Sequence, residues 1–180
     1  MNLLKSLLPN FVRVSIRRLV EKYHHSTYYR NQTVELGGRL EGYQVKGGKL
    51  TGFDNGTYEN DLCLIIENNV RPGMVCVDVG AHIGYITLLF AKLTGSNGQV
   101  TAFEAHPKNA YYVNTNIQMN RLTDYVRVEN IAVSDGQSTS VNLGQGRMSH
   151  AAEWKIQNNN ESTTGQIIVP ATSLDQYFSA

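Results

Sequence analysis

The ten residues 75–84 constrain the fold of this chain more than any other stretch, and they read VCVDVGAHIG. Their apolar, β-branched start predicts a buried strand, and Gly80 and Gly84 frame the sharp turn that follows. Apolar residues at helical spacing over 86–93 predict a helix directly after the turn. Glycine lets a backbone pass close to a ligand, and a helix N-terminus offers free N–H groups. The stretch therefore predicts a strand, a turn and a helix, with a ligand site at the turn.

A second predicted strand, residues 99–103, ends in Glu104, twenty residues after Gly84. An acid at that place can accept hydrogen bonds from both hydroxyls of a ribose. Because parallel strands end at one edge of a sheet, Glu104 is expected to lie beside Asp78 and the glycine turn. Together these residues predict a pocket for an adenosine-containing cofactor.

The residues of the turn discriminate between three classes of cofactor: a nicotinamide dinucleotide, ATP and S-adenosylmethionine. A nicotinamide cofactor calls for Gly-x-Gly-x-x-Gly, and here Ala81, His82 and Ile83 would crowd a pyrophosphate. An ATP-binding P-loop needs a lysine at the turn, and this turn has none. S-adenosylmethionine (SAM) has no phosphate and tolerates a bulkier turn, and Asp78 is placed to meet its ammonium group. The residues therefore favour SAM.

The rest of the chain alternates between strand and helix patterns, which predicts an α/β fold with a parallel sheet, flanking helices and right-handed crossovers. Before this region we expect an N-terminal helix and a small antiparallel β meander, followed by a helix over 58–69. The predicted division is residues 1–57 for the N-terminal part and 58–180 for the cofactor-binding domain. Residues 144–165 are expected to form a long loop. The predicted elements are meander strands at 33–36, 42–46 and 50–53, sheet strands at 74–79, 99–104 and 125–130, short strand-like runs at 141–143 and 167–169, and helices at 84–94, 107–119 and 172–178.

Composition excludes several functions for these 180 residues. A formal net charge of +1 gives no reason to expect nucleic-acid binding. The two cysteines, Cys63 and Cys76, match no metal or redox spacing, so we predict no metal site and a cytoplasmic location. No apolar run approaches the ~20 residues of a transmembrane helix. An apolar stripe over residues 4–20 predicts a helix that packs on its own domain or on a neighbouring subunit, with peripheral membrane binding as the alternative.

Several ordered blocks together resemble the FkbM family of class I SAM-dependent methyltransferases, which have a Rossmann-like fold. The likeness runs from about Tyr58 to the end of the chain. Members of that family are generally assigned to O-methyl transfer onto hydroxyls of sugars, polyketides and related metabolites. The matching blocks are Tyr58-Glu59, 70–74, 77–85, 102–107, 114–117 with Asn120, 130–135 and 172–175.

The resemblance implies roles for the matching positions. Asp78 would order the turn, Glu104 would hold the ribose hydroxyls, and Glu59 is either a helix N-terminal charge or a cofactor contact. His82 is the nearest candidate for the catalytic base, although turn packing is the simpler interpretation. The predicted cofactor-binding residues are Glu59, Asp78, Gly80, Ala81, His82, Gly84, Glu104, Ala105, His106, Ile131 and Ala132.

One departure from the family pattern affects the functional prediction. Family members continue past the segment that matches 172–175 into another central strand, whereas this sequence ends at Ala180. We therefore expect a fold that is incomplete at the C-terminus, with an unpaired edge on strand 74–79. The leading hypothesis is an O-methyltransferase that acts on a small-molecule or glycan acceptor. The alternative is an inactive cofactor-binding remnant, or half of a split enzyme that needs a complementing chain or a second copy.

Overall fold

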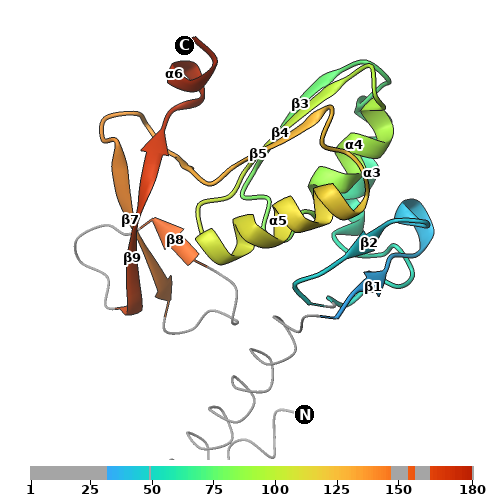
Figure 1. Ribbon diagram of the computed structural model, residues 1–180, viewed down its shortest axis with the longest axis horizontal. Helices are drawn as coiled ribbons and strands as arrows, with labels where there is room; N and C mark the ends of the chain where they lie inside the picture. Colours follow the sequence, from blue (N-terminus) through green and yellow to red (C-terminus); the bar gives the residue numbers. More distant parts are fainter. Residues whose placement is uncertain (1–31, 49, 147–153, 157–162, 180) are drawn as a thin grey trace, which may run out of the picture.

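The computed structural model describes residues 32–48, 50–146, 154–156 and 163–179 (Figure 1). The predicted N-terminal helix lies outside these residues. The described elements, in chain order, are β1 (Val34–Glu35), η1 (Gly38–Leu40), β2 (Gln44–Val45), α3 (Asn60–Asn69), β3 (Val75–Val79), α4 (Tyr85–Thr94), β4 (Gln99–Phe103), α5 (Pro107–Met119), β5 (Val126–Glu129), β6 (Ala132–Val133), β7 (Ser140–Gly146), β8 (Trp154–Ile156), β9 (Thr163–Thr172) and α6 (Leu174–Ser179).

Strands β3, β4 and β5 form a parallel sheet in that order. Val77 pairs with Thr101, and Thr101 pairs in turn with Arg127. Helix α4 follows β3 and helix α5 follows β4, so the alternation read from the sequence is confirmed. This is the parallel sheet with flanking helices of the predicted Rossmann-like class.

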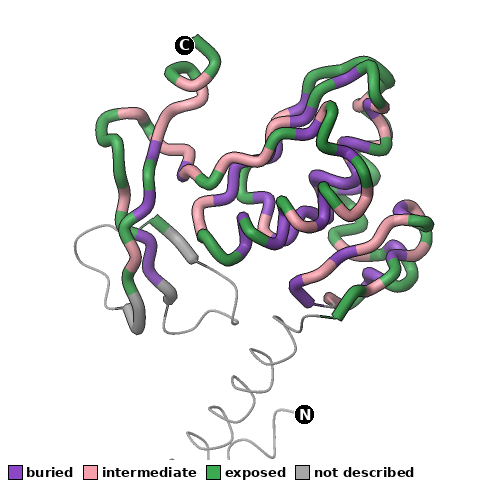
Figure 2. Tube along the Cα trace, in the orientation of Figure 1, coloured by how far each residue is buried: buried purple, intermediate pink, exposed green. Residues whose placement is uncertain are grey.

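The two faces of the sheet differ in burial because successive residues of a strand point to opposite sides. The face that carries Cys76, Val100 and Ala102 meets α4 and α5, and each of these side chains is at most 8% exposed. Leu88 of α4 and Val113 of α5 belong to the same core and are fully buried. Figure 2 shows buried residues recurring along these strands and along α4 and α5.

The opposite face and the outer edge of the sheet are more open. Val75 and Val79 of β3 are 67% and 54% exposed. Among the described residues, no strand pairs with the free side of β3. Tyr177 and Phe178 of α6 pack edge-on against Phe103, which is almost completely buried. The expected unpaired edge is therefore present in the part of the chain that the structure describes.

The predicted meander contains two strands instead of three. β1 and β2 pair antiparallel, but residues 50–53 form a turn. In that turn the N–H group of Phe53 donates to the carbonyl oxygen of Leu50, and Gly52 has a φ of +92°, a conformation that excludes a strand. Phe53 is nevertheless fully buried, in the same core as the sheet. A boundary between domains at residue 57 stays a prediction.

Residues 144–165 do not form the long loop that the sequence predicted, as far as they are described. β7 extends to Gly146, and β9 begins at Thr163 and pairs antiparallel with β7 over most of its length. β8 pairs with β7 on its other side, and β6 pairs parallel with β9. A four-stranded sheet therefore lies next to the parallel sheet, near the start of α5 (Figure 1).

Candidate functional site at the ends of two parallel strands

The turn after β3 is held against the end of β4. The N–H groups of Gly80 and Ala81 both donate to the carbonyl oxygen of Phe103, at 2.9 and 3.0 Å. Gly80 and Gly84 have φ values of +83° and +94°, and His82 has a φ of +57°. A Cβ at Gly80 would meet nothing within 4 Å, so its φ, and not lack of space, requires glycine there. The turn is consequently a tight structure with a fixed shape.

The carboxylate of Glu104 is fixed by hydrogen bonds from its surroundings. The N–H of His82 donates to Oε2 at 2.7 Å, and the N–H of His106 donates to Oε1 at 2.9 Å. The side chain of Asn109 also hydrogen-bonds this carboxylate. A carboxylate has about four acceptor sites, so roughly one remains for a ligand. This acid is therefore oriented before any ligand binds.

Burial raises the pKa of Glu104, and the hydrogen bonds from His106, His82 and Asn109 oppose that rise. The negative charge of Asp78 raises the pKa further, which places the two carboxylates close enough to interact. Glu104 is 7% exposed and Asp78 is 8% exposed. Among the described residues, neither acid forms a salt bridge.

Asp78 has one buried partner, which comes from the helix after the turn. The hydroxyl of Thr87 donates to its Oδ2 at 2.6 Å, and Thr87 is fully buried. Burial raises the pKa of Asp78, and the bond from Thr87 partly opposes this effect. Asp78 therefore connects the end of β3 to the first turns of α4.

Two histidines flank the acids, and their environments keep both neutral at pH 7. Burial lowers the pKa of His82 to about 4. Burial and then the charge of Lys108 lower the pKa of His106. A neutral imidazole can accept a proton, but a base with so low a pKa is weak. His82 stays a candidate for the catalytic base on position alone.

The end of β5 completes one side of the site. The side-chain amide of Asn130 donates to the carbonyl oxygens of Glu104 and Ala105, at 2.8 and 3.0 Å. Ala105 packs against the small apolar cluster that contains the buried Ala132. Ile131, between Asn130 and Ala132, is partly buried. The structure thus brings the predicted residues that follow β3, β4 and β5 to one edge of the sheet.

Glu59 does not follow any of these three strands. It precedes α3 in a left-handed conformation with a φ of +46°, and its side chain is exposed. Among the described residues, the hydrogen bonds of Asp78 and Glu104 come from other residues and not from Glu59.

Sequence reasoning missed the residues that orient the acids. Thr87 and Asn109 lie in helices, and Asn130 follows a strand. In the sequence they look like ordinary polar residues of helices and loops, so no local pattern indicated that they bond the acids. Asn130 belongs to a block that carried the family resemblance, and that block was the available signal for it. No periodicity or spacing identifies a hydrogen bond to a residue 26 positions away.

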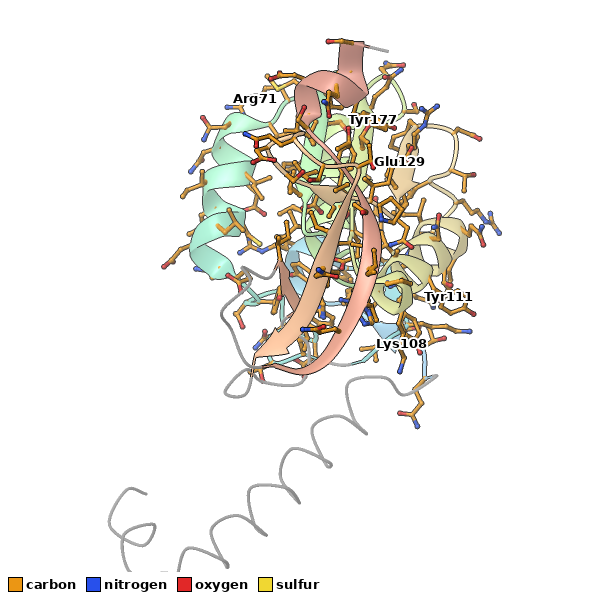
Figure 3. The ribbon with its side chains drawn as sticks, turned by 90° about the vertical axis from the view of Figure 1, so that its left-hand side faces the viewer. Arg71, Lys108, Tyr111, Glu129 and Tyr177 are labelled. Atoms are coloured by element: carbon orange, nitrogen blue, oxygen red, sulfur yellow. The ribbon has the colours of Figure 1, made fainter. Side chains whose placement is uncertain are left out.

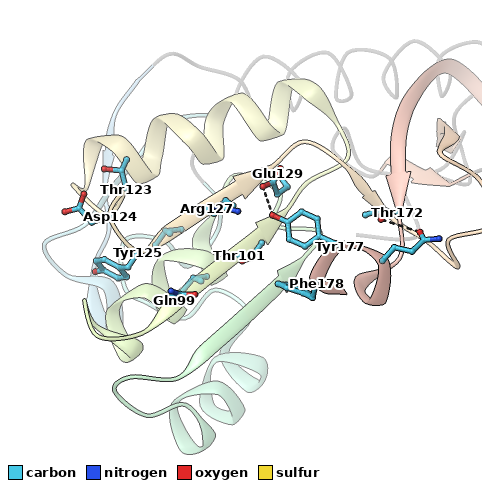
Figure 4. Close-up of a pocket in the computed structure, with 13 residues that line it drawn as sticks. Gln99, Thr101, Thr123, Asp124, Tyr125, Arg127, Glu129, Thr172, Tyr177 and Phe178 are labelled. Atoms are coloured by element: carbon cyan, nitrogen blue, oxygen red, sulfur yellow. Dashed lines mark hydrogen bonds between the residues drawn. The ribbon is translucent and has the colours of Figure 1, made fainter. Parts of the chain in front are cut away.

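A separate recess lies on the other face of the sheet, between β4, β5 and α6 (Figure 4). It has a volume of about 830 Å³, and Thr101, Arg127 and Glu129 line it. The hydroxyl of Tyr177 donates to Glu129 at 2.6 Å at its margin (Figures 3 and 4). None of the predicted cofactor-binding residues lines this recess.

A parallel sheet, a glycine turn after its first strand and an acid after its second strand define a Rossmann-like protein of the nucleotide-cofactor class. Within that class, residues 78–180 match the family described as "Methyltransferase FkbM domain". The chain belongs to this family, and the predicted membership in a group of SAM-dependent methyltransferases is confirmed.

Individual relatives share only parts of the chain. Protein-L-isoaspartate O-methyltransferase 1 of Arabidopsis thaliana is 30% identical over 76 residues, which are 42% of this chain and 33% of that protein. This chain therefore spans about a third of the length of that relative.

Two solved structures show a more distant likeness. A SAM-dependent O-methyltransferase of Thermotoga maritima is 22% identical with a TM-score of 0.40, and the match covers 46% of this chain and 30% of that one. An O-methyltransferase of Bacillus cereus in complex with SAH is 20% identical with a TM-score of 0.33, and covers 68% and 44% of the two chains. The assignment to the family rests on the sequence match and on the sheet itself.

No helix among the described residues is both long and apolar enough to cross a membrane.

Proposed function

We propose that this chain binds SAM at the ends of β3 and β4 and transfers its methyl group to a hydroxyl of a sugar, a glycan or a secondary metabolite. The observation that carries the proposal is the environment of Glu104. This acid is buried, lies beside Asp78 and is aimed by the N–H groups of His82 and His106. An oriented acid after the second strand of a parallel sheet suits a ribose hydroxyl.

The charge of the site agrees with SAM as the ligand. SAM carries a sulfonium and an ammonium group near its carboxylate, and two neighbouring buried acids favour a ligand with positive charge. The glycine turn would receive the methionine end, and Glu104 would accept a hydrogen bond from one ribose hydroxyl. Ala105 and His106 would lie beside the adenine, with Ile131 and Ala132 approaching from its other side.

The reaction requires an acceptor oxygen aligned with the sulfonium methyl group. Bound SAM would supply an electrophilic methyl group, and its transfer to the acceptor oxygen with loss of the carbon–sulfur bond would need a base to accept the hydroxyl proton. His82 is the candidate base within the described site. A cytoplasmic location and the small-molecule or glycan acceptor are parts of this proposal.

Calorimetric titration with SAM and with its product S-adenosylhomocysteine (SAH) tests the binding step. We expect both to bind, and we expect Glu104→Gln to weaken binding about tenfold because it removes the charge while keeping the size. Asp124→Asn is the matched control, since Asp124 is an exposed acid at the other end of the sheet. Absence of binding to the wild-type chain at millimolar cofactor would refute the proposal.

The exposed edge of β3 favours one second candidate, a cofactor-binding chain that needs a complementing chain for activity. Val75 and Val79 are exposed there, and an apolar edge strand is a template for pairing with another strand. A methyl-transfer assay with radiolabelled SAM and a panel of hydroxylated acceptors separates the two. Turnover by the chain alone excludes the second candidate.

A further inference from the structure

Residues 44–46, which contain β2, are bound along one side by two side-chain amides, that of Asn116 in α5 and that of Asn120 at its C-cap. The N–H of Gln44 donates to Oδ1 of Asn120 at 2.9 Å, and the amide of Asn120 donates to the carbonyl oxygen of Gln44 at 2.7 Å. Asn116 makes the same pair of bonds with the N–H and carbonyl of Lys46, at 2.7 and 3.0 Å. Each amide therefore replaces the donor and the acceptor that a neighbouring strand would supply.

The spacing of these residues explains why the pairing works. Two residues four apart on an α-helix are about 6 Å apart along its axis. Two residues two apart on a strand are separated by a nearly equal distance, about 6.7 Å. Asn116 and Asn120 thus fall in register with Lys46 and Gln44 as α5 passes β2 (Figure 1).

Asn116 has one contact that Asn120 lacks. Its amide also donates to the carbonyl oxygen of Ile83, at 2.7 Å. Ile83 lies in the turn after β3, between His82 and Gly84. Asn116 is fully buried, so the Ile83 carbonyl has no solvent to replace this donor. The second donor of Asn120 goes instead to the carbonyl oxygen of Asn116, at 2.7 Å.

The segment after β2 also packs against this turn. Gly47 has a φ of +107°, and a Cβ at that position would lie 3.1 Å from Cγ2 of Ile83 and 2.8 Å from the ring of Tyr112. The turn is therefore supported from two sides. Glu104 holds the N–H of His82, and Asn116 with the β2 segment holds Ile83.

We infer that Asn116 is a positioning residue for the cofactor and that it acts on the methionine end of SAM. It fixes the carbonyl of Ile83, and thereby the shape of the turn from Ala81 to Gly84, without touching the ligand. The inference rests on the proposed function. It also gives residues 44–47, which precede the matched family region, a part in forming the site.

Selectivity between two ligands tests the inference. SAH has an amino-acid end, whereas methylthioadenosine has the same adenosyl group without it. We expect Asn116→Asp to weaken SAH binding about tenfold, or about 1.4 kcal/mol, because it keeps the size and the acceptor for the N–H of Lys46 but loses the amide that donates to the carbonyl oxygens of Ile83 and Lys46. Methylthioadenosine binding should change less than about threefold. Calorimetric titration gives both constants.

Asn120→Asp is the control, because it removes the corresponding donor to the carbonyl oxygen of Gln44 but makes no bond to the turn. Gly47→Ala is a second test, since the added Cβ would press on Ile83 and on the ring of Tyr112 while the side chain of Asn116 stays intact, and we expect the same loss of selectivity. If Asn116→Asp and Asn120→Asp change the two affinities by equal factors, the inference is overturned while the proposed function stands. If the wild-type chain binds neither ligand, both fail.

Discussion

Replacing His82 with asparagine should change how the stability of this protein depends on pH. Burial lowers the pKa of His82 from 6.5 to about 4, so the folded chain keeps this side chain neutral where the unfolded chain protonates it. Between these two pH values the unfolded state binds more protons. The stability that a neutral His82 contributes is thus fully present above pH 6.5 and is lost as the pH falls toward 4.

The size of the effect follows from the two pKa values. The difference corresponds to about 3 kcal/mol of unfolding free energy at most. His82 keeps some exposure to solvent, so we expect about 2 kcal/mol between pH 7.5 and 4.5. Asparagine is a suitable replacement because it tolerates a φ of +57° and retains the N–H that donates to Glu104.

Urea unfolding of both proteins at several pH values measures this effect. Asp78 and Glu104 have raised pKa values, so the stability that they contribute is present at low pH and is lost as the pH rises through those raised values. The pH dependence that the two acids give to the unfolding free energy is opposite in sign to that of His82. It is present in both the wild type and His82→Asn. The difference between wild type and His82→Asn isolates the histidine. Parallel stability curves from pH 7.5 to 4.5 would show that His82 is not neutralised by burial.

Two further substitutions test the acid pair and the sheet edge. Thr87→Val should lower the unfolding free energy by about 1–3 kcal/mol in urea titrations at pH 7, because Asp78 loses a buried donor; an unchanged midpoint would contradict this role of Thr87. Val75→Lys should reduce self-association measured by light scattering, because a charge on an edge strand opposes pairing. Ile168→Lys is the control, since Ile168 is 75% exposed on the inner strand β9, and an equal reduction there would contradict the role of the edge.

The parallel sheet could be predicted because its signals are local. The strand expected at 74–79 is found at Val75–Val79, and the helix expected at 107–119 is found at Pro107–Met119. Buried parallel strands are continuous apolar runs, and glycines mark the turns between strand and helix. Such patterns need no knowledge of distant contacts.

The second sheet could be predicted only in part: the strand-like runs expected at 141–143 and 167–169 lie within β7 and β9, but the full length and pairing of these strands could not be predicted. Residues 163–166 read Thr-Thr-Gly-Gln, a polar stretch, and they are strand because β9 pairs with β7. Residues 50–53 carry a strand-like apolar pattern, yet Phe53 reaches the core from a turn. In both places pairing and packing with distant residues outweigh local preference.

The residues of the candidate site also fall into two groups, those marked by local sequence patterns and those defined by distant contacts. Asp78 and Glu104 were identified because strand ends and spacing mark them. Thr87 and Asn116 were missed because their partners lie elsewhere in the chain, and the partners of Asn116 are 33 and 70 residues away. Residues that contact a ligand follow motifs, whereas residues that hold those motifs in place are defined by the fold.

The two halves of the proposed site form one hydrogen-bonded unit. Glu104, the acid proposed to bind the ribose, also holds the N–H of His82 in the turn proposed to receive the methionine end. Loss of its charge should therefore weaken the adenosyl and the amino-acid contacts together. Asn116 reaches the same turn from the opposite side, through the carbonyl oxygen of Ile83. Its loss should affect the amino-acid end alone. The two residues thus predict different binding patterns for SAH and methylthioadenosine, although both support a single turn of the backbone.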